Sequence, residues 1–296
     1  MKYETVIALG VLMGSLSRLF LLHIDYRQYP TYPQGYIVHL SLGVVAAALG
    51  AVSIPALLEK EYAAVTFLAI AAQHFRDVRS MERDSLAKME ETELVRRGSA
   101  YIEDIAKKFE SRNYVAIITA FLTSLSTIIF RSYFAGVLIG GFMIGVLKLT
   151  VRTKHIKDIA EVRPAELVFE GPFLKVEGIV FTNVGLTAAK EKLKKQAIAC
   201  IIIPKDENAM ATLSNIGQRQ AILHDLSVQL GIRKEKDEPE FSPMTKRNSD
   251  TGVIGVVTLA MEGDMECMIE AVRNCPVLES VKRHPLESRA GKAAAD

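Results

Sequence analysis

The chain has 296 residues, which suggests about two domains, and its net charge is +2. Apolar residues make up 49% of it and charged residues 24%, because long apolar segments up to about residue 150 are followed by evenly spread charges. From Val151 onward 21 Lys and Arg stand against 21 Asp and Glu, so this part lacks the clustered basic face that nucleic-acid binding requires. The three cysteines have no CxxC spacing, which argues against a disulfide framework and a zinc site.

Five apolar segments predict membrane-spanning helices. Residues 5–22 and 36–58 are long enough to cross a bilayer, and the first lacks the cleavage site of a signal peptide. Residues 62–75 would cover only about 21 Å at a helical rise of ~1.5 Å per residue, so a full crossing and a re-entrant segment both stay open. Residues 114–130 and 133–149 predict a helical hairpin, because only two residues join them.

The basic residues of the loops predict the orientation. Residues 76–113 hold nine Lys and Arg, whereas Lys60 and Arg131 are alone in the opposite loops. The positive-inside rule therefore places residues 76–113 and the C-terminal part in the cytoplasm of a multi-pass protein of the cell membrane. Five crossings would leave the N-terminus outside, and four would leave it inside.

Glycines recur four residues apart within the apolar segments. This spacing lets helix backbones approach closely, so it predicts packing within the chain or an interface in a homo- or hetero-oligomer. The pairs are Gly10 with Gly14, Gly136 with Gly140, and Gly141 with Gly145.

One titratable residue, His39, lies well inside a predicted span. A lone histidine is thin support for a transport path, and a structural role is the favoured interpretation. Arg18 lies nearer a span end, where a long side chain can reach the membrane interface.

Residues 99–113 predict an amphipathic helix. Ser99 is a suitable N-cap, and Ile102, Ile105, Ala106 and Phe109 recur at steps of three and four. Because basic residues border this stripe and a span follows it, the helix fits the inner membrane surface. A helix that packs on its own neighbours explains the stripe equally well.

Upstream, three arginines share one face of a predicted helix: Arg76, Arg79 and Arg83, with Glu82 nearby. Next to a membrane they could bind lipid phosphates or the carboxylates of a partner. A salt-bridged, solvated surface is the alternative.

The hexapeptide Tyr101–Ala106, YIEDIA, resembles the signature of the YIEGIA family, polytopic membrane proteins of endospore-forming Firmicutes. Chain length and the apolar front half also fit, so the resemblance covers essentially the whole chain. It implies a role in sporulation and spore-envelope assembly together with a small protein partner. Tyr101, Ile102, Glu103 and Ile105 are the motif residues expected to bind that partner or the membrane surface. Asp104 stands where the family has Gly, so tight backbone packing at that position does not carry over.

Strands and helices alternate after residue 150, which predicts a soluble α/β sandwich with a ferredoxin-like ending. The predicted strands lie on both sides of Gly171-Pro172 and at 197–204, 253–261 and 277–284, and the predicted helices at 187–196, 207–230 and 264–275. The predicted domains follow from these elements. Residues 1–75 hold three spans, residues 76–113 are cytoplasmic, and residues 114–150 form a hairpin of two spans. Residues 151–284 form a cytoplasmic domain with a flexible loop at 231–251, and residues 285–296 form a disordered tail.

Motifs of nucleotide binding and hydrolysis are not found: the sequence has no GxGxxG, P-loop, GxSxG or HExxH. His155, His224 and His284 are far apart, and Asp225 beside His224 fits an exposed helix face. We therefore expect no catalytic residue, metal or cofactor. The sequence predicts a non-catalytic membrane protein of sporulation that recruits partners during envelope assembly. A transporter, a membrane enzyme or a ligand sensor is the alternative.

Overall fold

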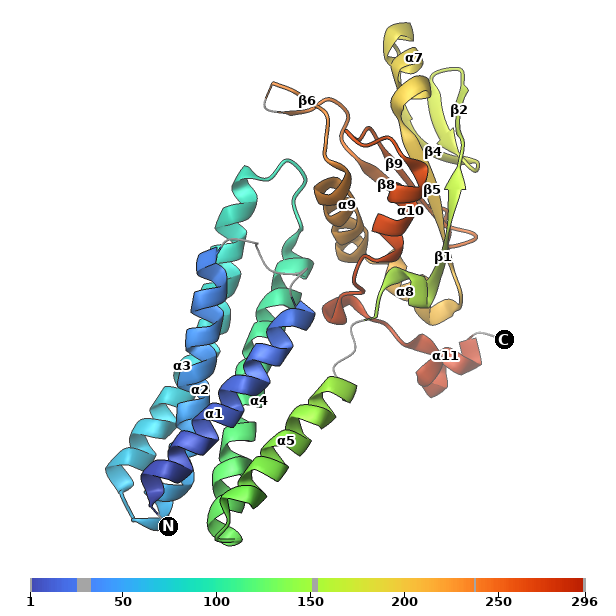
Figure 1. Cartoon of the computed structure of the whole chain (residues 1–296). Helices are drawn as coiled ribbons and strands as arrows, with labels where there is room; N and C mark the ends of the chain where they lie inside the picture. The colour runs from blue at the N-terminus through green and yellow to red at the C-terminus, as the bar shows by residue number, and fades with distance from the viewer. Residues whose placement is uncertain (1, 26–32, 151–153, 237, 295–296) are drawn as a thin grey trace. The chain divides into compact units, whose positions relative to one another are not determined.

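The computed structural model describes residues 2–25, 33–150, 154–236 and 238–294, and it divides into two compact units (Figure 1). The helical unit comprises Met1–Ser85 and Ile105–Arg152. The α/β unit comprises Leu86–Asp104 and Thr153–Asp296. Residues 86–104 thus belong with the C-terminal domain, although the sequence-based boundaries put them in a separate segment.

Among the described residues up to position 150, the long helices are α1 (Tyr3–Asp25), α2 (Pro33–Leu58), α3 (Tyr62–Met89), α4 (Ser99–Ile129) and α5 (Tyr133–Thr150). Helix α3 runs unbroken from the apolar segment 62–75 into the charged residues after it. Helix α4 likewise joins the predicted amphipathic helix to the predicted span without a break. Neither helix contains Gly or Pro, the residues that most readily end a helix, so the backbone has no reason to stop within them.

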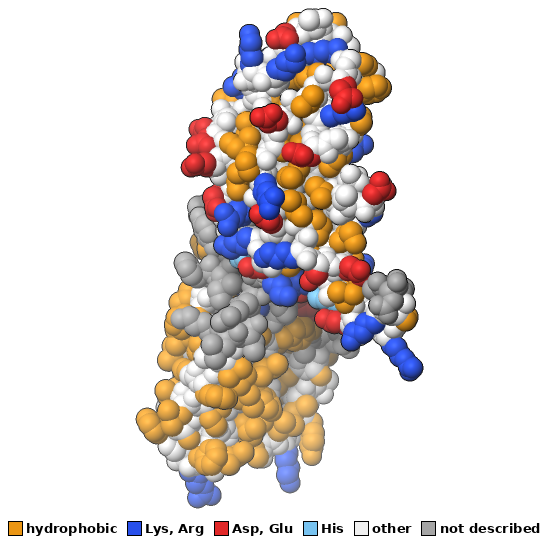
Figure 2. Space-filling view, turned by 90° about the vertical axis from the view of Figure 1, so that its right-hand side faces the viewer, with side chains coloured by type: hydrophobic (Ala, Val, Ile, Leu, Met, Phe, Trp, Pro, Cys, Tyr) orange, Lys and Arg blue, Asp and Glu red, His pale blue; other side chains and the backbone are white. Residues whose placement is uncertain are grey.

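Three of these helices contain segments long and apolar enough to cross a membrane: Tyr3–Leu22, Gly35–Leu58 and Ser99–Ile129. Tyr133–Leu147 is apolar but shorter. Large hydrophobic side chains such as Ile37 and Phe142 are exposed on the helical unit, and Figure 2 shows such side chains covering much of its visible surface. A surface of this kind suits lipid as its solvent.

Small residues bring the helices of this unit together. A Cβ atom added at Gly14 would lie 2.7 Å from Ala47 Cβ on α2 and 2.8 Å from the Ala116 carbonyl oxygen on α4. One added at Gly140 would lie 2.7 Å from Thr123 Oγ1. Gly10 and Gly136 are equally tight, so packing within the chain is confirmed for these four glycines. Gly141 and Gly145 differ, because among the described atoms nothing lies within 4 Å of an added Cβ.

Two antiparallel sheets form the centre of the α/β unit. The larger has the order β1 (Ala160–Ala165), β5 (Ile198–Pro204), β9 (Ile254–Thr258) and β8 (Met244–Arg247). The smaller contains β2 (Leu167–Glu170), β3 (Phe173–Val176) and β4 (Ile179–Asn183) in sequence order. A short hairpin joins β6 (Lys234–Glu235) to β7 (Glu238–Pro239).

Helices cover one face of the larger sheet (Figure 1). Side chains alternate along β5, so that Cys200 and Ile202 pack with residues of the helices while Ala199 packs with the smaller sheet. The helices of this unit are α6 (Ile156–Ile159), α7 (Thr187–Gln196), α8 (Glu207–Ser214), α9 (Ile216–Leu230), α10 (Met265–Arg273) and α11 (Arg289–Ala294), and the short 3-10 helices are η2 (Glu90–Thr92), η3 (Glu279–Val281) and η4 (Pro285–Glu287).

The closing strand predicted at 277–284 is wrong. Leu278 N–H donates to Gln218 Oε1 on α9 at 2.8 Å, and η3 follows directly. The backbone donor that a strand would need is therefore used by a helix side chain. A strand–helix–strand ending of the ferredoxin-like kind is absent from the described residues.

Three smaller predictions also need correction. The helix predicted at 207–230 is two helices, because the Asn215 side chain accepts a hydrogen bond from Gly217 N–H at 2.8 Å and caps α9. The predicted loop 231–251 contains β6, β7 and β8, of which β8 pairs with β9. The tail predicted to be disordered contains η4 and α11 up to residue 294.

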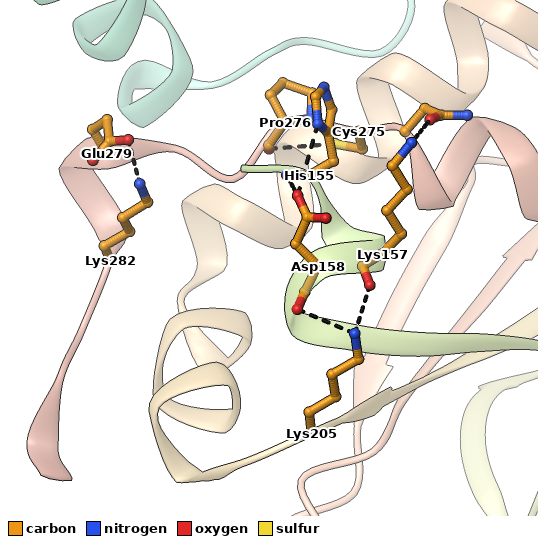
Figure 3. A network of polar contacts seen from close by, with 9 residues as sticks. His155, Lys157, Asp158, Lys205, Cys275, Pro276, Glu279 and Lys282 are labelled. Atoms are coloured by element: carbon orange, nitrogen blue, oxygen red, sulfur yellow. Dashed lines mark hydrogen bonds and ion pairs between the residues drawn. The ribbon is translucent and has the colours of Figure 1, made fainter. Parts of the chain in front are cut away.

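A network of hydrogen bonds connects α6 to the ends of β5 and α10 (Figure 3). His155 N–H donates to Asp158 Oδ2 at 2.7 Å, which caps α6. Lys205, after β5, donates to the carbonyl oxygens of Lys157 and Asp158 at 2.7 and 3.1 Å. The Lys157 ammonium in turn donates to Asn274 Oδ1 at 2.9 Å. His155 thus has a structural role at a helix start.

The cysteines provide a first test of this fold. Cys200 and Cys275 are buried and Cys267 is exposed. Burial raises the pKa of Cys200 to about 12, and the charge of Asp264 raises the pKa of Cys267. Because the thiolate is the reactive form, a maleimide at mildly alkaline pH should label the folded protein at Cys267 alone and all three thiols after denaturation, as peptide mass spectrometry would show. Labelling of Cys200 in the folded protein would contradict the buried position of β5.

Candidate functional site

The segment from Leu86 to Asp104, here called the docked segment, is built into the α/β unit. Its loop is closed by the buried carboxylate of Glu90, which accepts hydrogen bonds from the backbone N–H groups of Arg97 and Gly98. Gly98 has a φ of +88°, a conformation that favours glycine. The loop is therefore held in one shape directly before α4 begins.

Helix α9 provides the surface that receives this loop. The His224 Nδ1–H donates to the Val95 carbonyl oxygen at 2.7 Å, and Arg97 Nε–H donates to His224 Nε2 at 3.1 Å. The Gln220 side-chain amide donates to the Arg96 carbonyl oxygen. His224 is only 4% exposed, so an exposed helix face does not explain the pair of His224 and Asp225.

The first turns of α4 continue the docking. Tyr101 is buried, its hydroxyl donates to Asp225 Oδ1 at 3.2 Å, and its ring meets the His224 ring edge-on at a centroid distance of 6.1 Å. The Ser280 hydroxyl donates to the Ala100 carbonyl oxygen at 3.2 Å. Hydrogen bonds therefore fix both sides of this helix start.

Asp104 closes the docked segment. Its carboxylate, 1% exposed, accepts hydrogen bonds from the backbone N–H groups of Glu279 at 2.8 Å and Ser280 at 3.3 Å. These N–H groups begin η3, where the first backbone donors have no partner within the helix. The residue that departs from the family hexapeptide thus has a clear role of its own, as the acceptor of two backbone hydrogen bonds.

The hexapeptide is therefore buried over most of its length. Tyr101, Ile102 and Ile105 are each at most 4% exposed. Of the two open interpretations of the stripe, this burial favours a helix that packs on its own chain over a helix on the membrane surface. Glu103 is partly exposed. The apolar stripe in the sequence could not distinguish these two interpretations, because packing in a protein core and packing on lipid require the same apolar period.

The arginine-rich face of α3 is divided among different partners. Arg79 Nη1 lies 3.4 Å from Glu110 Oε2, and the exposed Arg83 lies 3.2 Å from Asp84 Oδ1. The Arg76 side chain lies outside the described residues. Both described guanidinium groups thus pair with carboxylates of this chain, and an exposed pair of this kind contributes at most about 1 kcal/mol.

The helical unit contains a buried polar cluster formed by Arg18, His39 and Glu82. Arg18 Nη2–H donates to His39 Nδ1 at 3.3 Å, and His39 Nε2 lies 3.7 Å from Glu82 Oε1. The Phe109 ring lies against the group, 4.4 Å from the His39 ring and 5.7 Å from the Arg18 guanidinium.

Arg18 is fully buried, so its predicted reach to the membrane interface is wrong. Its partners His39 and Glu82 lie on other helices, far away in the sequence. Their presence there is the only sequence feature that could have indicated the cluster. Buried ionisable groups among apolar helices are costly and therefore point to function. Among the described residues no group of three His, Cys, Asp or Glu side chains has the arrangement of a metal site.

Comparison with known proteins places the chain in a family. Residues 6–288 match the family described as "YIEGIA protein". "Uncharacterized protein YphB" of Bacillus subtilis (strain 168), an endospore former, is 43% identical over 285 residues, which cover 96% of each chain. No solved structure matches. The match over nearly the whole chain and the identity to the Bacillus relative together show that this protein belongs to the YIEGIA family.

Proposed function

We propose that this protein is an integral membrane protein of sporulation that recruits partners to the membrane during assembly of the spore envelope. The observation that carries the proposal is the division of α4. Its first six residues belong to the α/β unit, and the same helix continues as an apolar segment of the helical unit. A helix shared in this way suits an anchor that presents a soluble domain. Membership of the YIEGIA family supports the link to endospore formers.

The proposed topology has five crossings with the α/β unit in the cytoplasm. The three long apolar helices support it directly, while α3 and α5 would complete it. The basic residues between positions 76 and 113 support the cytoplasmic side. The mother-cell and forespore membranes are the proposed locations, and the α/β unit would act there as a layered sandwich without catalysis.

Purification of the tagged full-length protein from sporulating cells tests this function. We expect a small protein to copurify, and Glu103→Ala combined with Arg79→Ala to reduce its yield at least fivefold, because these are the partly exposed polar residues of the motif and of the arginine face. Lys246→Ala, at an exposed position of β8, is the matched control and should retain the partner. Full recovery of the partner by a correctly folded double variant would count against recruitment through these residues.

The buried cluster of Arg18, His39 and Glu82 favours a second function, the transport or sensing of a small molecule. Ionisable groups shielded from water can bind a polar ligand strongly. In that case a ligand from a metabolite panel should raise the melting temperature of the purified protein, and His39→Ala should abolish the shift. His74→Ala is the control, because the His74 side chain is 72% exposed. A shift that survives His39→Ala would exclude this cluster as the binding site.

A further inference from the structure

The hydrogen bonds of His224 fix its protonation state in the docked arrangement. A carbonyl oxygen can only accept, so Nδ1 carries the proton that is donated to Val95 at 2.7 Å. A guanidinium can only donate, so Nε2 must accept from Arg97 at 3.1 Å through its lone pair. Both contacts can exist together only while the imidazole is neutral.

We propose that the docked segment is a pH-sensitive latch, held on α9 by neutral His224 and released when this side chain is protonated. Protonation turns Nε2 into a donor that faces another donor. It also places a second positive charge beside the Arg97 guanidinium, because Arg97 Nε and His224 Nε2 are only 3.1 Å apart. In the undocked state water can solvate both cations, so acid favours release.

The charged groups around His224 allow this response. From the loop, Arg97 faces the ring, and the Glu90 carboxylate is engaged by the backbone N–H groups of Arg97 and Gly98. From α4, Tyr101 contributes its ring and a hydroxyl that donates to Asp225, the neighbour of His224 on α9. Asp225 and Glu90 are thus both engaged as hydrogen-bond acceptors, Asp225 by the Tyr101 hydroxyl and Glu90 by the loop backbone.

The expected size of the effect follows from proton linkage. Release that takes up one proton becomes more favourable as the pH falls, by at most tenfold for each pH unit. The latch lies at the start of α4, so its release would free the residues that begin an apolar helix. This inference does not depend on the proposed recruitment function.

Hydrogen–deuterium exchange of the full-length protein in detergent, followed by peptide mass spectrometry, tests the latch. After correction for the intrinsic effect of pH, peptides from residues 93–104 should exchange up to about tenfold faster at pH 5.5 than at pH 7.5, while β5 peptides should not change. His224→Gln, which does not titrate, should remove the difference. His284→Gln, a histidine on the surface of the same unit beside Glu287, should retain it.

An unchanged exchange rate in the wild-type protein, or an equal acceleration in His224→Gln, would overturn the latch. Should His224→Gln fail to fold, Arg97→Gln replaces it. Its neutral amide can accept from a protonated ring, so the acceleration should fall to less than half of the wild-type value. A pH response of Arg97→Gln as large as that of the wild type would equally overturn the proposal.

Discussion

Replacing Asp104 by alanine should destabilise the α/β unit by about 2–3 kcal/mol, since hydrogen bonds to a charged group are among the stronger ones. The change removes the acceptor of two backbone N–H groups, of Glu279 and Ser280, at the start of η3. Amide exchange of the buried strands β5 and β9 in the full-length protein reports the opening of this unit. We expect their protection to fall by a factor of about 30 or more.

Two further variants separate charge from shape at this position. Asp104→Asn keeps an acceptor oxygen and should lose less than half as much stability as Asp104→Ala. Asp104→Gly restores the family hexapeptide and should lose about 1 kcal/mol more than alanine, because glycine disfavours the helix. A protection factor of Asp104→Ala within twofold of the wild type would show that the carboxylate does not hold η3.

Replacing Gly14 by leucine should disrupt the helical unit, with a loss of about 3 kcal/mol or more. The new side chain would begin 2.7 Å from Ala47 Cβ and 2.8 Å from the Ala116 carbonyl oxygen, and two helices would have to move apart. Gly145→Leu is the matched control, because an added Cβ there meets no described atom within 4 Å. It should leave stability unchanged or raise it slightly through helix propensity.

Thermal unfolding in detergent, followed by size-exclusion chromatography, distinguishes the two glycine variants. We expect Gly14→Leu to aggregate or to melt at a clearly lower temperature, whereas Gly145→Leu should elute and melt like the wild type. If both variants behave alike, the close approach of α1 to α2 and α4 is not what holds the helical unit together.

The apolar periods predicted much of the fold. The limits of α2 and α7 lie within a few residues of the predicted ones, because burial of an apolar face decides where such elements form. The continuity of α4 was missed because its composition changes near residue 113 while its backbone does not. The strand predicted at 277–284 does not form, because the Leu278 N–H donates to the side chain of Gln218, sixty residues earlier in the chain.

The candidate site was less predictable than the fold. The sequence singled out Tyr101 and its neighbours as a unit, yet it left open whether their apolar face packs on a membrane surface or on the chain itself. Their true partners are His224, Asp225 and the start of η3, all more than 120 positions away. Hydrogen bonds between such distant residues have no period in the sequence, so only the three-dimensional structure brings them together.

Labelling of the exposed Cys267 in living protoplasts tests the proposed anchoring of a cytoplasmic α/β unit most directly. Protoplasts of a spore-forming bacterium that express the full-length chain would be treated with a membrane-impermeant maleimide before and after permeabilisation. With helices in the bilayer and the α/β unit inside, Cys267 should react only after permeabilisation, and alkaline carbonate should leave the chain in the membrane fraction. Labelling of Cys267 in intact protoplasts, or release of the chain by carbonate, would contradict this arrangement.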